Sequence, residues 1–158
     1  MDYPLDMENN NLLYVGKRDW QWIDDVAIGI RSPDARAIIQ KLQKDGARFL
    51  DFLEQHPENI PRSRRFIHCY QSRAKRFVHE YEKMEATGIS VGCIQKAKEQ
   101  LQDGLQKLLV AYQAEYENLL QDDFIDVEAE VRVLDQFLTI EGISPIPDND
   151  PNTDGNST

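Results

Sequence analysis

The sequence predicts an all-α protein, an antiparallel helical bundle of three long helices plus one or two short ones. Apolar residues recur every three or four positions along most of the chain. No segment alternates between apolar and polar residues as a half-buried strand does. Proline, glycine or aspartate stands between the periodic segments, and the short connections favour antiparallel neighbours. With 158 residues, the chain is long enough for one domain with its own core.

The predicted bundle domain covers residues 19–143. Residues 1–18 show no clear helical period, so an irregular N-terminal segment is expected there. Residues 144–158 hold three prolines together with Asn, Asp, Ser and Thr, a composition that predicts a disordered tail.

The first two predicted helices have clear boundary signals. Asp19 is expected to cap a short helix that includes Ile23 and Ile30. Ser32-Pro33-Asp34 combines a capping serine, proline at the first helical position and an early acid, and so predicts the start of a long helix. His56-Pro57 should end this helix, because the residue before proline is pushed out of the helical region.

The later helices are predicted from similar signals. One helix should run from Pro61 to Thr87-Gly88, and the longest should begin near Ser90. A break is expected at Asp122-Asp123, after which Asp126 caps a last helix that ends at Gly142. The apolar face of that last helix is made of Val127, Val131, Leu134, Phe137 and Leu138.

The charge of the chain is uneven. The net charge is −10, made of +2 in residues 1–98 and −12 in residues 99–158. An acidic surface of this size repels nucleic acid, so no nucleic-acid partner is expected. No apolar run approaches the ~20 residues of a membrane span. The predicted location is the cytoplasm, with peripheral association with a membrane, or an anchor outside this chain, left open.

One stretch is similar to the cysteine phosphatase signature, in which His-Cys is followed by five residues and then arginine. Here His68-Cys69 is followed at the sixth position by Lys75, and Arg76 comes one residue late. No glycine lets the backbone curl around a phosphate, and the stretch lies inside a strongly periodic segment. A structural role is therefore favoured over thiolate catalysis.

No metal site or cofactor is predicted. His68 and His79 are eleven residues apart, about 16 Å along one helix, which is too far to share an ion. The acids from Asp122 onward lack the alternating spacing and the central glycine of a calcium loop. Capping and solvation of a helix start explain them better.

The segment from Pro61 is the one basic element of an acidic protein, and it supplies the candidate site. Its arginines can pair with acidic helices of the bundle, or they can bind an anion or an acidic partner. The candidate anion- or partner-binding residues are Arg62, Arg65, Arg73 and Arg76.

Two stretches together resemble the 5-bromo-4-chloroindolyl phosphate hydrolysis (XpaC-like) family. They are Arg48-Phe49-Leu50-Asp51-Phe52-Leu53, followed by Pro61 to Phe66, Tyr70 and Tyr81, and Asp122 to Val131, followed by Leu134 and Glu141-Gly142. The resemblance covers about residues 35–143. It implies a connection with phosphate ester hydrolysis and an association with toxic-anion (tellurite) resistance proteins. It supplies no catalytic residue for this chain.

Two functions follow as hypotheses. The first is a non-catalytic helical interaction protein with a protein partner, in a toxic-anion resistance or stress system; a homo-oligomer is left open. The second is a weak phosphate ester hydrolase that uses Arg73, Arg76 or neighbouring basic residues as an anion clamp and a carboxylate from the later helices as base. The lack of an assembled catalytic motif favours the first.

Overall fold

The computed structural model describes residues 3–143, with side chains from residue 7. In this part of the chain the elements are α1 (Tyr3–Ala27), α2 (Pro33–Gln55), a 3₁₀-helix η1 (Pro57–Ser63), a π-helix η2 (Phe66–Gln71), α3 (Ser72–Ala86) and α4 (Gly92–Ile140). The described residues contain no strand, so the prediction of an all-α fold is confirmed. None of their helices is long and apolar enough to cross a membrane.

The chain divides into two compact units, one ending at Leu119 and one beginning at Leu120. The first unit includes α1 from Tyr3 and stops within α4, whereas the bundle domain over residues 19–143 stays a prediction. The tail predicted for residues 144–158 lies outside the described residues.

Helix α1 corrects the prediction of an irregular segment over residues 1–18. Leu12, Gly16, Asp19 and Ile23 follow one another at helical spacing and are all buried. The period was hidden because glycine and aspartate occupy two of these four buried positions. Asp19 accordingly lies inside the helix and is not its cap.

Helix α2 begins and ends where the sequence predicts. The Ser32 side chain accepts a hydrogen bond from the backbone N–H of Ala35, which is the expected capping interaction. Glycine weakens a helix interior, but close packing explains its presence at position 46. A Cβ at this position would meet Trp20 Cδ1 at 3.1 Å and Tyr112 Cε2 at 3.6 Å, so α1 and α4 approach α2 here.

The segment after α2 is helical but not one regular α-helix. Pro57 starts η1 and Pro61 lies inside it, and neither proline has an N–H to donate to a regular ladder. The π-helix η2 follows, with Phe66, Ile67 and Gln71 buried. The prediction of one helix from Pro61 is therefore correct in that the segment is helical. It is wrong in that the segment passes from a 3₁₀-helix through a π-helix to the α-helix α3. The predicted stop is found, with Gly88 at φ +64°.

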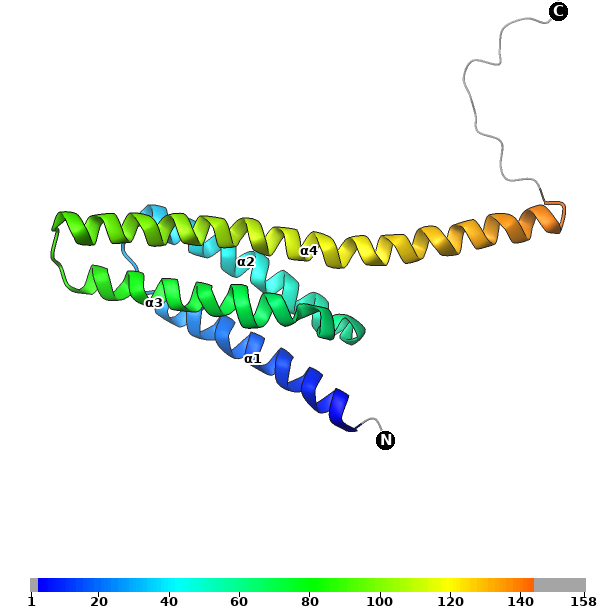
Figure 1. Ribbon diagram of the computed structural model, residues 1–158, viewed down its shortest axis with the longest axis horizontal. Coiled ribbons are helices and arrows are strands. Elements are labelled where there is room, and N and C mark those ends of the chain that lie inside the picture. The colour runs from blue at the N-terminus through cyan, green and yellow to red at the C-terminus, as the bar shows by residue number, and fades with distance from the viewer. Residues whose placement is uncertain (1–2, 144–158) are drawn as a thin grey trace, which may run out of the picture. The chain divides into compact units, whose positions relative to one another are not determined.

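The core of the first unit forms between α1, α2, η2, α3 and the part of α4 up to Leu119. Figure 1 shows short connections joining α1 to α2 and α3 to α4, so each pair runs antiparallel. The ring of Phe66 stacks on Phe49 with centroids 3.8 Å apart and meets the edge of Tyr112 at 4.7 Å. These rings link η2, α2 and α4 into one apolar core.

Helix α4 corrects the predicted break at Asp122-Asp123. The helix is continuous from Gly92 to Ile140, so Asp126 does not cap a separate helix. Aspartate costs only about 0.7 kcal/mol or less in a helix interior, and neither proline nor glycine lies between Gly104 and Gly142 to stop the helix.

Candidate functional site

The second unit presents an apolar helix face, which we call the α4 seam. Its members are Leu120, Phe124, Val127, Val131, Leu134 and Leu138. The middle four are between 50% and 63% exposed, and Leu120 and Leu138 are partly buried. Ile125, Val133, Phe137 and Ile140 add further exposed apolar surface on the same helix. Contiguous exposed apolar surface of this kind is typical of an interaction site.

Acidic side chains border the α4 seam. At 3.6 residues per turn, Asp123 and Glu130 fall along one edge of the seam, and Glu128 and Asp135 fall along the other. Within the part of the chain that the structure describes, none of these four carboxylates forms an ion pair. Residues 120–143 carry seven acids and one base, Arg132, so this surface has a strongly negative potential.

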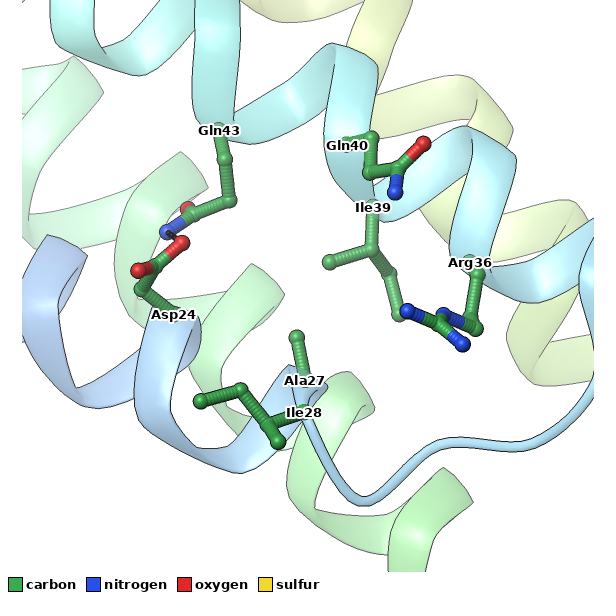
Figure 2. A pocket seen from close by; sticks show the side chains of 7 residues that line it. All are labelled: Asp24, Ala27, Ile28, Arg36, Ile39, Gln40 and Gln43. Atoms are coloured by element: carbon green, nitrogen blue, oxygen red, sulfur yellow. Dashed lines mark hydrogen bonds between the residues drawn. The ribbon is translucent and has the colours of Figure 1, made fainter.

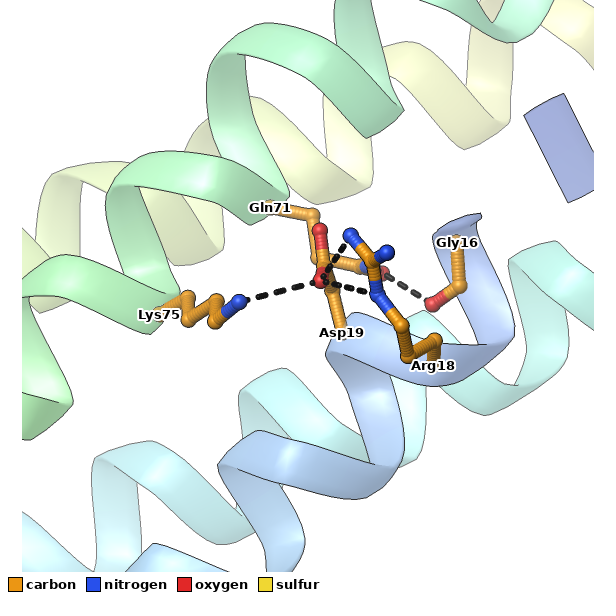
Figure 3. A network of polar contacts seen from close by, with 5 residues as sticks. All are labelled: Gly16, Arg18, Asp19, Gln71 and Lys75. Carbon is orange, nitrogen blue, oxygen red and sulfur yellow. Dashed lines mark hydrogen bonds and ion pairs between the residues drawn. The ribbon is translucent and has the colours of Figure 1, made fainter. Parts of the chain in front are cut away.

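A second candidate is the polar network around Asp19 in the first unit (Figure 3). The Asp19 side chain is buried, and its Oδ1 accepts from Lys75 Nζ at 3.3 Å and from the Arg18 guanidinium at 3.3 Å. Gln71 Nε2 donates to the carbonyl of Gly16 at 2.6 Å, while Gln71 Oε1 is buried without a partner. The network joins α1 to η2 and α3, and a carboxylate neutralised by two cations is suited to holding helices together.

The ammonium group of Lys75 is engaged by a second partner besides Asp19. Its ammonium group lies 5.1 Å from the Trp22 ring centroid, and the same ring packs against His79 with centroids 5.5 Å apart. Trp22 therefore packs on the bundle. With its cation shared between a carboxylate and an aromatic face, Lys75 is engaged in packing α1 against α3.

The four predicted arginines lie in η1, directly before η2 and in α3. Arg65 donates from Nε to Glu115 Oε1 at 2.6 Å, and this hydrogen bond raises the pKa of Arg65. Arg62 is an exposed residue of η1. Arg73 and Arg76 are exposed one turn apart on α3, and among the described residues neither has an ion-pair partner. Of the two roles predicted for these arginines, pairing with an acidic helix within the bundle is the one that Arg65 has.

The phosphatase-like stretch forms no phosphate-binding loop. Cys69 lies in η2, exposed and free, and its carbonyl accepts the backbone N–H of Ser72. Because the backbone groups here are used in helical hydrogen bonds, they cannot cradle an anion. This geometry agrees with the structural interpretation of the stretch.

A shallow pocket lies between α1 and α2, with a volume of about 250 Å³ (Figure 2). Asp24 and Arg36 stand on opposite sides of it, and Asp24 Oδ1 accepts from Gln43 Nε2 at 3.5 Å. Gln43 also donates to the carbonyl of Trp20, and the Trp20 indole donates to the carbonyl of Gln43. The pocket is smaller than the roughly 300–1,000 Å³ typical of ligand sites, and the hydrogen bonds of Asp24 and Gln43 serve helix packing.

Metal-ligating side chains do not converge in the described part of the chain. Between residues 3 and 143, no group of three or more His, Cys, Asp or Glu side chains is arranged to hold an ion. The acidic residues of α4 spread around the helix instead of facing a common point.

Over residues 3–143, the fold and surface define an all-α protein with an exposed helix face that is apolar and bordered by acids. The family model described as "5-bromo-4-chloroindolyl phosphate hydrolysis protein" matches residues 8–134, and the chain belongs to this family. The match begins earlier than the resemblance over residues 35–143 and includes most of α1. Neither a curated protein nor a solved structure matches the chain.

The sequence-based predictions lack two features of these candidate sites. The predicted apolar face of the last helix shares Val127, Val131, Leu134 and Leu138 with the α4 seam, but it lacks Leu120 and Phe124, and its exposure is not predicted. The acids on both edges of the seam are the sequence signal for this exposure, because a helix packed among neighbours in a core seldom has both edges charged. The predictions lack the Asp19 network because they place Asp19 at a helix cap. Its helical spacing with Leu12 and Ile23 pointed to an interior position.

Proposed function

We propose that this chain is a non-catalytic helical interaction protein whose binding surface is the α4 seam. The supporting observation is the exposure of four large apolar side chains, Phe124, Val127, Val131 and Leu134, in one row on one helix. Burying them against a partner would gain about 25 cal/mol per Å² of apolar surface, which favours association.

We further propose that the partner belongs to a toxic-anion resistance or stress system and that the protein acts in the cytoplasm. The first part rests on the resemblance noted from the sequence, which implies association with tellurite resistance proteins. The two free cysteines, Cys69 and Cys93, agree with a reducing compartment.

The test is proximity crosslinking in the native host, with the parent and two double variants. Val131→Glu with Leu134→Glu places two charges in the seam, whereas Ala129→Glu with Gln136→Glu places the same charges on the opposite, exposed face of α4. We expect a specific protein to be crosslinked by the parent and by the opposite-face variant, and lost in the seam variant. Equal crosslinking by all three would exclude the seam as the binding surface.

A second candidate function is weak hydrolysis of a phosphate ester. It is favoured by the family description and by the exposed guanidinium groups of Arg73 and Arg76 on α3, which have no ion-pair partner between residues 7 and 143 and suit an anion. It predicts saturable turnover of an indolyl or nitrophenyl phosphate by highly purified protein. Loss of that turnover in Arg73→Ala, with Cys69→Ser unchanged, would support an arginine clamp, and absence of turnover would eliminate the candidate.

A further inference from the structure

The α4 seam has the spacing of a coiled-coil interface. From Leu120 to Leu138 the apolar residues are separated by four, three, four, three and four positions. With Phe124 at position a of a heptad, Val127 and Leu134 occupy d, and Val131 and Leu138 occupy a again. An apolar repeat of seven residues lets a second helix pack along the seam over its whole length.

The positions beside this seam specify the charge of the second helix. Glu128 and Asp135 occupy e positions, and Asp123 and Glu130 occupy g positions. These positions face the flanks of a partner helix, where opposite charges attract and like charges repel.

We infer that the α4 seam binds an amphipathic helix with lysine or arginine along the flanks of its apolar stripe. This inference rests on the proposed function and specifies the partner's chemistry. The four carboxylates lack ion-pair partners among the described residues, so basic flanks would provide the missing complement. The same carboxylates oppose an anionic lipid surface.

A second copy of this chain does not have the required chemistry. Two seams packed together would bring carboxylates against carboxylates in either helix direction, because both flanks are acidic. The basic helix α3 of a second copy is also unsuitable, since its apolar residues Ala74, Val78 and Tyr81 are already buried in the first unit. Residues 144–158 cannot supply basic flanks either, because their sequence contains acids and no lysine or arginine.

The experiment uses two synthetic helical peptides of about four heptads as probes. Both have leucine at a and d positions; one has lysine and the other glutamate at e and g. Binding to the full chain is measured by titration calorimetry. We expect the lysine peptide to bind at least about tenfold more tightly than the glutamate peptide, with an affinity that falls as salt rises.

The variants separate apolar docking from simple charge attraction. Val131→Glu with Leu134→Glu makes the helix more acidic, so attraction by charge alone would strengthen binding of the lysine peptide. We expect instead a loss of about tenfold or more, while Ala129→Glu with Gln136→Glu stays within about twofold of the parent. Circular dichroism and thermal unfolding of each variant check that the helices remain folded.

Three results would overturn the inference: equal binding of the two peptides, no binding of the lysine peptide, or seam variants that bind it as tightly as the parent. Sedimentation equilibrium tests the alternative occupant of the seam, a second copy of this chain. A parent dimer that dissociates in the seam variant would assign the seam to a second copy. If seam-dependent crosslinking in the host survives any of these outcomes, the proposed function stands and only the basic partner is excluded.

Discussion

Two parts of helix α4 carry similar apolar patterns in different surroundings. Up to Leu119, the pattern faces the core of the first unit, and Leu105 is 0% exposed. From Leu120 on, the pattern continues at coiled-coil spacing, but Leu134 is 55% exposed. The first part contacts aromatic residues of α2 and η2, whereas the seam of the second part has acids on both edges.

The difference teaches that an amphipathic pattern predicts a buried face without specifying what buries it. Leu105 and Tyr112 meet partners supplied by the same chain. Four seam residues, Phe124, Val127, Val131 and Leu134, are exposed, and this exposure is the physical reason to propose a second helix. Variants in the two parts should therefore affect different properties, stability in the first and binding in the second.

The largest effect is expected in the buried part of α4. Leu105→Ala removes a fully buried side chain and leaves a cavity, which should lower the free energy of unfolding by about 2–5 kcal/mol. Urea unfolding followed by circular dichroism measures the change. A loss below about 0.5 kcal/mol would contradict the packing of this part of α4 in the core.

A smaller loss is expected when the Asp19 network is broken. Asp19→Ala removes the acceptor of Lys75 and Arg18 and should cost about 1–3 kcal/mol, because charged hydrogen bonds in a buried position are lost. The matched variant Asp126→Ala, on the exposed part of α4, should change stability by about 0.5 kcal/mol or less. Equal losses in the two variants, measured by urea unfolding, would show that the network contributes nothing specific.

The buried part should also respond to alkaline pH. Burial, with a smaller contribution from the charge of Asp19, raises the pKa of Tyr112 above its ordinary value of 10.0. The stability due to the neutral phenol is complete below about pH 10 and is lost as pH rises toward the folded-state pKa, by up to about 1.4 kcal/mol per pH unit. Tyr112→Phe should remove this part of the slope in unfolding measurements above pH 10. The exposed Tyr14→Phe serves as control and should leave the slope unchanged.

The smallest effect on stability is expected in the seam. Leu134→Ala shortens an exposed side chain and should change the free energy of unfolding by about 0.5 kcal/mol or less. The same variant should weaken binding of the lysine-flanked peptide, because a d-position contact is lost. A stability loss as large as that of Leu105→Ala would show that the seam is buried in the folded chain.

The sequence predicts most of the helices but not their geometry or their surroundings. Ser32-Pro33 and Thr87-Gly88 define boundaries correctly, because caps and stops are local signals. Helix α1 was missed up to residue 18, since Gly16 and Asp19 interrupt its apolar period with residues that only tertiary contacts explain. The π-helix η2 and the exposure of the seam depend on which segments pack together, and no local pattern encodes that.

Accessibility of position 134 is the most direct test of the central claim, that the seam is open in the free protein and covered by a basic helix. Leu134→Cys, in a chain with Cys69→Ser and Cys93→Ser, is reacted with a maleimide and compared with an unstructured cysteine peptide. We predict a labelling rate within about threefold of the peptide's, and a clear slowing when the lysine-flanked helix is added. Slow labelling of the free chain, or a rate that the basic helix leaves unchanged, would contradict the claim.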